Sequence, residues 1–394
     1  MSVVVAGYAR TPFARYTGAL ASVPAVELGA AAVRAALARA GVDPHEVDRV
    51  VAGQVLQGGA GQNPARQAAV AASIPLTVPA LTLNAVCLSG TEAVAAAAAL
   101  LASGEAQIVV ALGMESMSLA PHAWPGARAG ARYGAVELLD TLEHDGLTDA
   151  FEHRSMGAST EDGNTDLGLD RASQDAWAAL SHQRAEASRD LVAPEITPVE
   201  VGGRRPTSVT TDDGVRPGTT VESLTALRPA FRLDGTITAG NSSQVTDGAA
   251  ALVLMTSQAA ADRGITGLAT VEAHALVAGP DVRLHGQPAA AIRTALARVG
   301  ATPADLRAVE INEAFAAVAV HSTAQLGVDT AIVNPWGGAI ALGHPIGASG
   351  ARIVGTLARQ LVALQESGPD APLGAAGICG GGGQGSAIVL RAIG

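Results

Sequence analysis

Two cysteines, Cys87 and Cys379, stand in glycine- or serine-rich turns rather than in apolar runs, which makes both candidates for chemistry. In LTLNAVCLSGTEAV, an extended segment delivers Cys87 to the start of a long Ala-rich helix. A helix N-terminus stabilises negative charge, so we expect Cys87 to have a lowered pKa and to act as a nucleophile. Ser89 and Gly90 would keep the turn small enough for a substrate carbonyl to approach. The competing interpretation of Cys87 is a small buried apolar residue.

A histidine, His344, lies in the glycine-rich loop GGAIALGHPIGASG before a second predicted helix. Pro345 restricts the backbone, and the glycines leave open space around the imidazole. A histidine on an apolar helix face is more often structural, whereas one held in a rigid loop suits a general base. We expect His344 to remove the thiol proton of Cys87.

The second cysteine, Cys379, opens the run CGGGGQG, which is followed by SAIVL. Residues 380–385 satisfy G-x-G-x-x-G, but a dinucleotide-binding fingerprint must open a helix, and SAIVL is typical of a strand. We therefore predict a glycine turn between two strands. Backbone N–H groups of such a turn could form an oxyanion hole beside Cys379.

Two polar residues, Asn312 and Glu313, follow a predicted strand in VEINEAFA. Asn312 could be a plain helix N-cap. Alternatively, its amide could hold a water or a carbonyl in the active cleft.

An internal repeat explains how these segments could meet. Residues 30–50 match residues 289–309, and the predicted helix after Cys87 matches the one after Gly347. Apolar runs at 108–113 and 373–379 follow the two helices and are typical of buried strands. We predict two similar α/β halves whose equivalent helices start side by side around a pseudo-twofold axis, which would bring Cys87 and His344 together.

The segment between the halves has a different character, with more charged and turn residues and one clear predicted helix at 171–190. We interpret residues 117–244 as an inserted loop domain that caps the substrate site. The predicted N-terminal half is then 1–116 plus 245–269, and the C-terminal half is 270–394.

The composition excludes several function classes. All 25 basic residues are arginine, so no mechanism that needs a Schiff-base or P-loop lysine applies. The net charge of −11 argues against a nucleic-acid binder. Two cysteines cannot build a four-ligand zinc site, and we expect no metal. No apolar stretch reaches the roughly eighteen residues of a membrane span, and the N-terminus is unlike a signal peptide, so we expect a cytoplasmic protein.

The four motifs in this order resemble the thiolase family over essentially the whole chain. The matching segments are N-A-V-C-x-S-G, N-E-A-F-A, G-G-A-I-A-x-G-H-P-x-G-A-S-G and C-G-G-G-G-Q-G. The resemblance implies a five-layer α-β-α-β-α thiolase-like fold with an inserted loop domain. It also implies an acetyl-CoA C-acetyltransferase, which condenses two acyl-CoA thioesters or cleaves a 3-ketoacyl-CoA with CoA through an acyl-Cys87 intermediate.

By resemblance, His344 activates Cys87, and Cys379 exchanges the α-proton of the second acyl-CoA. Asn312, through a water, and His344 would stabilise the enolate. The backbone amides of Cys87 and Gly381 would bind the carbonyl oxygen of the acyl-enzyme.

The resemblance also suggests contacts with coenzyme A, which serves as substrate and product and not as a cofactor. Two departures leave the chain-length preference open: Ser155 stands where many biosynthetic relatives have histidine, and Leu284 begins a segment that replaces the family's Met-Gly-x-Gly-Pro. The residues expected to bind the substrate are Arg216 near the adenine, Ser243 at the pantetheine, and Met156, Phe315 and Leu284 along the acyl and pantetheine pocket.

Three alternatives compete with this interpretation. One is a long-chain 3-ketoacyl-CoA thiolase of fatty-acid β-oxidation. Another is a ketoacyl synthase, in which decarboxylation would make Cys379 redundant as a base. The third is a non-catalytic acyl-CoA-binding protein on the same fold. We expect acyl-CoA and CoA as partners and a homodimer or homotetramer as the assembly.

Overall fold

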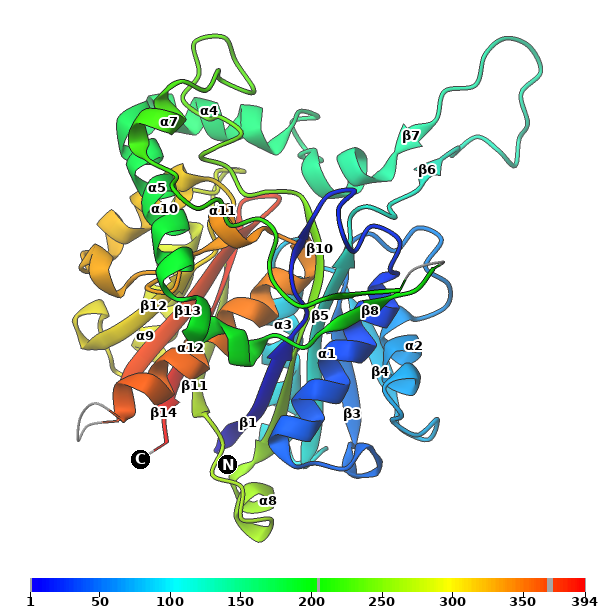
Figure 1. Cartoon of the computed structure of the whole chain (residues 1–394), viewed down its shortest axis with the longest axis vertical. Coiled ribbons are helices and arrows are strands. Elements are labelled where there is room, and N and C mark those ends of the chain that lie inside the picture. Colours follow the sequence, from blue (N-terminus) through cyan, green and yellow to red (C-terminus); the bar gives the residue numbers. More distant parts are fainter. Residues whose placement is uncertain (1, 204–205, 367–370, 394) are drawn as a thin grey trace.

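The computed structural model describes residues 2–203, 206–366 and 371–393. A first set of strands and helices lies on the right of the molecule in Figure 1, and the inserted segment extends across the top of the molecule and down its left side. Its elements are β1 (Val3–Arg10), β2 (Ala14–Arg15), α1 (Ala25–Ala40), β3 (Arg49–Gly53), α2 (Pro64–Ala71), β4 (Ala80–Leu83), α3 (Ser89–Ala102), β5 (Ile108–Ser116), β10 (Thr246–Thr256) and α8 (Ser257–Asp262).

A second set repeats this order, as the duplicated sequence predicts. Helix α9 corresponds to α1, β12 to β3, α12 to α3, and β13 to β5. The elements are β11 (Ala269–Ala278), α9 (Gln287–Arg298), β12 (Leu306–Ile311), α10 (Ala316–Leu326), α11 (Ala339–Leu342), α12 (Ile346–Gln365), β13 (Leu373–Gly380) and β14 (Gln384–Ala392).

The strands of both halves join into one mixed sheet in the order β12-β13-β14-β11-β1-β10-β5-β3-β4. Each half has the same pairing, with a parallel pair (β3 with β5, β12 with β13) followed by antiparallel neighbours. The halves meet where β1 pairs antiparallel with β11, from Val3 opposite Val271 to Val5 opposite Ala269. Apart from β4, which extends the first half at the edge, the pairing is therefore two-fold symmetric about this junction.

Helices cover both outer faces and also fill the space between the two halves of the sheet (Figure 1). One core cluster joins α1 and α2 to their strands, a second contains α3 and α12, and a third contains α9 and α10. The predicted five-layer arrangement is confirmed.

The central helices α3 and α12 cross at glycines near their N-termini. A Cβ atom on Gly90 would lie 2.5 Å from Ala351 N, and one on Gly350 would lie 2.2 Å from Thr91 N. Only glycine permits this approach. The helices thus start side by side, as predicted, but Gly90 is small in order to pack against α12 and not to admit a substrate carbonyl.

The inserted segment contains more regular structure than the sequence suggested. Helix α5 (Arg171–Ala187) matches the predicted helix, but α4 (Met156–Leu167) was missed because MGASTEDGNTDL has no apolar periodicity. The Oγ atom of Ser155 caps α4 by accepting a hydrogen bond from Ala158 N–H. The remaining elements are β6 (His122–Ala123), β7 (Leu139–Asp140), the π-helix η2 (Leu142–Leu147), α6 (Arg189–Val192), β8 (Val199–Val201), β9 (Thr207–Val209) and α7 (Val221–Thr225).

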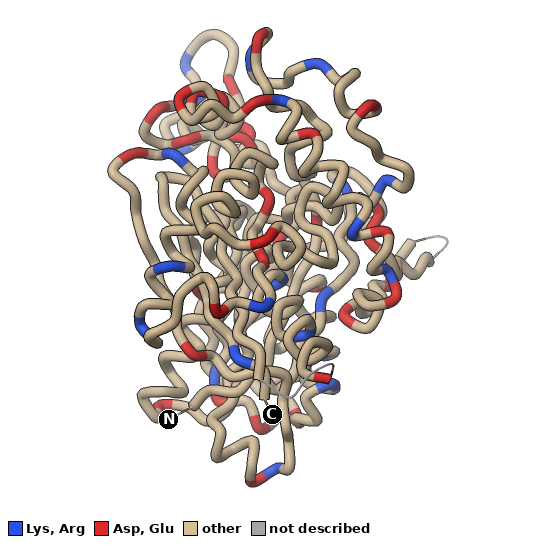
Figure 2. The backbone as a smooth tube through the Cα atoms, turned by 90° about the vertical axis from the view of Figure 1, so that its left-hand side faces the viewer, with Lys and Arg blue, Asp and Glu red and all other residues tan. Residues whose placement is uncertain are grey.

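A buried ionic contact fastens the inserted segment to the core. Arg10 on β1 is fully buried, with Nε 3.2 Å from Glu195 and its two terminal nitrogens 2.7 and 2.8 Å from Asp212. Elsewhere, acidic and basic residues are interspersed along the chain, and the view in Figure 2 shows no extended basic face. Among the described residues, no helix has the length and apolar character needed to cross a bilayer.

Candidate active site

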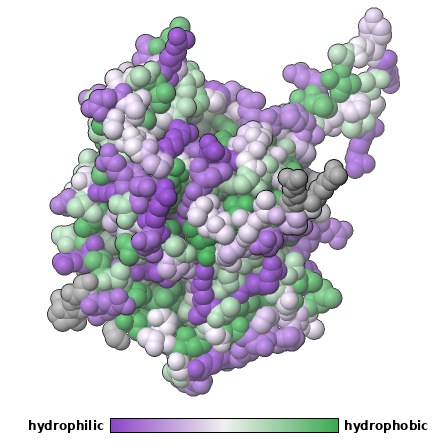
Figure 3. All heavy atoms as spheres, in the orientation of Figure 1, coloured by the Kyte–Doolittle hydropathy of each residue, from purple (hydrophilic) through white to green (hydrophobic). Residues whose placement is uncertain are grey.

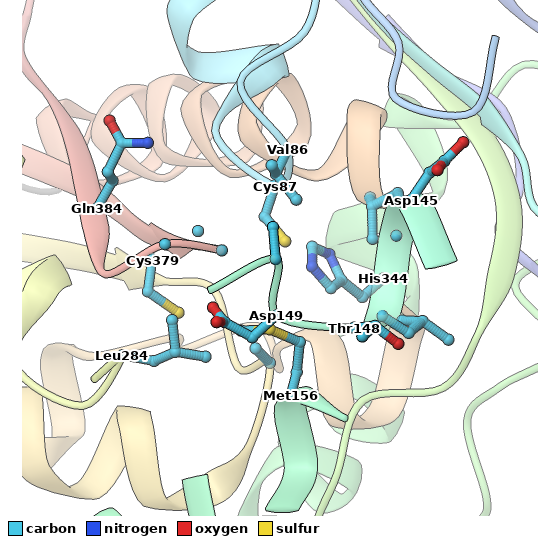
Figure 4. Close-up of a pocket in the computed structure, with 18 of the residues that line it drawn as sticks. Val86, Cys87, Asp145, Thr148, Asp149, Met156, Leu284, His344, Cys379 and Gln384 are labelled. Carbon is cyan, nitrogen blue, oxygen red and sulfur yellow. The ribbon is translucent and has the colours of Figure 1, made fainter. Parts of the chain in front are cut away.

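A cavity of about 700 Å³ lies where the loops before α3 and α12 meet the β13–β14 turn, beneath the inserted segment. Cys87, His344 and Cys379 all line it, and Figure 4 shows the two sulfur atoms and the imidazole around the same space. The repeat thus brings together the three residues as the sequence predicts. Five further residues expected at the site also line this cavity: Gly381, Ser243, Met156, Leu284 and Phe315.

The backbone turns sharply immediately before Cys87. Val86 has φ = 52°, a left-handed conformation that a β-branched residue adopts only under constraint. The side-chain Oδ1 of Asn84 accepts a hydrogen bond from Val86 N–H at 2.9 Å. Ser89 Oγ donates to Val86 O at 2.6 Å and accepts from Ala85 N–H at 2.9 Å. Ser89 therefore holds the turn in place, and the turn presents Cys87 to the cavity.

The expected lowering of the Cys87 pKa is wrong. Burial raises the pKa of this thiol to about 12; the backbone N–H groups of Cys87 and Gly381 lower it, and Glu115 raises it further. The helix N-terminus and its amides are present, but loss of hydration outweighs them. The resting residue is a thiol, so a base must remove its proton.

His344 is arranged to be that base. Burial and the charge of Arg352 lower its pKa to about 3, so the imidazole is neutral near pH 7. Its Nδ1 lies 2.6 Å from Ser349 Oγ, and the Ser349 hydroxyl can donate to Pro345 O at 3.0 Å. In that arrangement Nδ1 carries the ring proton and donates to Ser349, and the Nε2 lone pair stays free. Nε2 has no hydrogen-bond partner among the described residues.

Asn312 lies behind the imidazole rather than on the cavity surface. Its amide nitrogen is 3.4 Å from His344 Nδ1, and its Oδ1 has no hydrogen-bond partner among the described residues. The alternative that Asn312 caps a helix is wrong, because α10 begins at Ala316 with Phe315 at the cap position. The neighbouring Glu313 is structural: it accepts hydrogen bonds from Trp177, Ser181, Asn334 and Ile340.

Cys379 is the penultimate residue of β13 and is almost completely buried. Burial and the nearby Cys87 raise its pKa far above the usual thiol range. The predicted glycine turn between two strands is confirmed, and Gly382 and Gly383 have positive φ of 77° and 69°. Gly380 packs on Leu88, where an added Cβ would lie 2.8 Å from Leu88 Cγ. This contact places the turn that carries Cys379 directly beside the loop that carries Cys87.

The wall beneath Cys379 is apolar. Leu284, Phe315 and Met156 pack with Cys379 in one cluster, and the Phe315 ring meets Phe231 edge to face at 6.2 Å. Ser243 at the rim donates its hydroxyl to Ala314 O at 3.0 Å. A flexible thioester-linked chain could lie along this wall with its polar groups at the rim.

Two residues singled out by the resemblance, Arg216 and Ser155, do not line this cavity. Arg216 is exposed and is not among the residues lining the cavity; its backbone N–H donates to His182 Nδ1 at 3.2 Å. Ser155 is also absent from the lining, and its side chain caps α4.

Other lining residues come from the inserted segment and were missed. His144, Asp145, Thr148, Asp149 and Phe151 border the cavity on or just after the π-helix η2. A π-helix at a cavity often marks a functional site, but LEHDGL carries no local signal for one. Ser349, which contacts His344, was visible only as part of the glycine-rich motif.

Comparisons with known proteins agree with this geometry. The family models described as "Thiolase, N-terminal domain" and "Thiolase, C-terminal domain" match residues 3–258 and 265–392. A "Probable acetyl-CoA acetyltransferase" of Mycolicibacterium smegmatis is 52% identical over 99% of this chain and 100% of its own length. An "Acetyl-CoA acetyltransferase" of Cupriavidus necator is 47% identical over 99% of both chains. The crystal structure of the Bacillus anthracis acetyl-CoA acetyltransferase superposes with a TM-score of 0.94, at 36% identity, over 99% of this chain and 98% of that one.

Proposed function

The chain belongs to the thiolase family, and on that premise we propose that it is an acetyl-CoA C-acetyltransferase in which Cys87 carries the acyl group. The assignment of roles rests on one observation. The thiols of Cys87 and Cys379 and the neutral imidazole of His344 line the same cavity.

In the first half-reaction, His344 Nε2 takes the proton of Cys87 as the sulfur attacks the acyl-CoA carbonyl. The thioester to Cys87 forms, the bond to CoA breaks, and the imidazolium returns its proton to the CoA sulfur. The backbone N–H groups of Cys87 and Gly381 stabilise the carbonyl oxygen. Both amides lower the pKa of the Cys87 thiol, which supports this role.

In the second half-reaction, His344 Nε2 takes the proton of the Cys379 thiol, and the Cys379 thiolate removes the α-proton of a second acetyl-CoA. The carbanion attacks the Cys87 thioester, forms the new carbon–carbon bond and releases the Cys87 thiolate, which takes the proton back from His344 Nε2. A thiolate of high pKa is a strong base, which suits the weakly acidic α-carbon. Once protonated, His344 Nε2–H stabilises the enolate oxygen directly, and Asn312, which does not line the cavity, would act on it only through a water. Thiolysis is the reverse sequence.

Substrate binding follows the same cavity. Met156, Leu284 and Phe315 form the apolar wall for the acyl and pantetheine chain, and Ser243 at the rim contacts the pantetheine. Arg216, outside the cavity, would reach the adenine end, and CoA serves only as substrate and product. The second candidate is a longer-chain 3-ketoacyl-CoA thiolase, since the segment that begins at Leu284 replaces the family's Met-Gly-x-Gly-Pro and leaves the chain-length preference open.

The assembly is proposed to be a homodimer or homotetramer. Strand β4 is an edge of the sheet. Leu81 on this strand is 60% exposed, and Leu76, which precedes it, is 68% exposed. The β6–β7 segment projects from the body with the exposed Tyr133, Val136 and Leu138, and Figure 3 shows apolar side chains on it. Light scattering of the purified chain measures the state. A cytoplasmic location stays a prediction.

The experiment that tests the function is thiolysis of acetoacetyl-CoA by CoA, followed through the loss of enolate absorbance. We expect activity in the wild type and its loss in Cys87→Ala and His344→Ala. A parallel assay with a long-chain 3-ketoacyl-CoA decides between the two candidate substrates. Inactivity with both, in a folded protein, would reject the assignment.

The contact between His344 and Ser349 leads to a prediction with a smaller expected effect on the rate. Ser349→Ala removes the acceptor that holds Nδ1, so the imidazole loses its orientation. A lost buried hydrogen bond costs roughly 1–3 kcal/mol, and kcat should fall about five- to hundredfold with little change in KM. Steady-state kinetics check this, and an unchanged kcat would show that packing alone orients His344.

A further inference from the structure

A fully buried carboxylate, Glu115, lies at the end of β5 beside the site. Its Oε2 accepts hydrogen bonds from Val55 N–H at 3.0 Å and Gly347 N–H at 2.9 Å, and its Oε1 accepts from Leu56 N–H at 3.1 Å. No ion pair joins Glu115 to a cation in the part of the chain that the structure describes. Burying an unpaired charge is costly unless each oxygen is hydrogen-bonded, as it is here.

The three N–H groups belong to elements that shape the site. Gly347 lies in the first turn of α12, three residues after His344, and α12 offers its positive end to the carboxylate. Val55 and Leu56 follow β3 and pack in one apolar cluster with Ile346 and Cys87. Space around the carboxylate is tight, since a Cβ on Gly347 would lie 2.7 Å from Glu115 Oε2.

We propose that Glu115 is a positioning residue for the reaction: its carboxylate ties the start of α12 to the segment after β3 and so fixes His344 relative to Cys87. The inference rests on the proposed function. The carboxylate fills this role best, because both of its oxygens are strong acceptors for the three N–H groups. A proton on Oε1 would leave Leu56 N–H facing a hydroxyl, which is a weaker acceptor.

The charge state of Glu115 links this role to pH. Burial raises its pKa to about 7; the three amides lower it and Asp247 on β10 raises it again. Cys87 and His344 have pKa values of about 12 and about 3, far from neutrality. Burial also raises the pKa of Asp247, and it raises that of Glu310, which pairs with Arg352 on α12, to about 7, so the Glu115→Gln variant is needed to assign the rise. The activity should therefore rise with pH through about 7 as the carboxylate forms.

The stability should move in the opposite direction. The folded pKa of Glu115 lies above its ordinary value of 4.5, so the folded state favours the protonated form. That contribution is complete below the ordinary pKa and is lost as pH rises through about 7. If activity rises with pH while stability falls with pH, Glu115 has a functional role. A purely structural carboxylate would not raise the activity in this way.

The test compares Glu115→Gln with a matched control, Glu161→Gln. Glu161 on α4 is also buried and accepts hydrogen bonds from the backbone N–H groups of Thr236 and Ile237. Thiolysis of acetoacetyl-CoA is measured from pH 5.5 to 9 with each full-length protein. We expect Glu115→Gln to lower kcat about ten- to hundredfold with KM kept, and to abolish the rise near pH 7. Glu161→Gln should keep that rise, whatever stability it loses.

A second readout does not depend on the reaction. The rate at which iodoacetamide alkylates Cys87 reports how His344 activates the thiol, and in the wild type it should also rise through pH 7. The inference is overturned if the alkylation rate of the wild type does not change through pH 7. It is also overturned if the Glu115→Gln protein is alkylated at the wild-type rates. An inactive wild type whose alkylation still follows Glu115 would instead reject the proposed function and leave the positioning role standing.

Discussion

Replacing Cys379 by serine will lower the rate of thiolysis by about two to four orders of magnitude while leaving acyl transfer to Cys87 intact. Serine keeps the shape of the side chain but is a far weaker acid than a thiol, so the anionic base becomes inaccessible. Transfer of an acetyl group to Cys87 requires no α-proton. The overall rate is measured with acetoacetyl-CoA, and the half-reaction by exchange of labelled CoA into acetyl-CoA.

The control for this prediction is Cys87→Ala, which should lose both the overall reaction and the exchange. If Cys379→Ser lost the exchange as well, Cys379 would be needed for acylation and not for the α-proton. If it kept full thiolysis, another group would be the base.

Gly350→Ala should destabilise the protein by about 1–3 kcal/mol or more and abolish most activity. The new methyl group would lie 2.2 Å from Thr91 N and 2.4 Å from Thr91 Oγ1, so the backbones of α3 and α12 must separate. Because the loops before these helices carry Cys87 and His344, the separation moves the nucleophile away from its base. Urea unfolding and thiolysis kinetics measure the two effects.

Gly202→Ala serves as the control, since nothing lies within 4 Å of a Cβ at that position. It should leave stability and activity nearly unchanged. A Gly350→Ala protein of wild-type stability would mean that the two helices are free to shift, and the close crossing would not be what fixes the site.

The fold could be predicted because its signals are local or repeated. Helical periodicity, glycine breaks and the internal match of residues 30–50 with 289–309 indicated two α/β halves, and the equivalent elements are confirmed. The juxtaposition of Cys87 with His344 followed from the same repeat. The missed helix α4 lacks such a signal, because it is stabilised by its cap and by contacts from distant segments.

The errors at the site share one cause, which is burial by residues distant in sequence. The helix N-terminus near Cys87 is visible locally, but the desolvation that raises its pKa comes from surrounding elements. Gly90 looked like room for a substrate because its neighbour Ala351 is more than 250 residues away along the chain. Glu115 looked like an ordinary strand residue, since its three partners come from two other segments.

The most direct test of the account is to locate the acyl group on the protein. Wild-type protein is mixed with acetyl-CoA, quenched in acid and mapped by peptide mass spectrometry. One acetyl group on Cys87, still formed in Cys379→Ser and absent in Cys87→Ala, is the predicted result. Acetyl on Cys379 or on another residue, or none on an active protein, would contradict it.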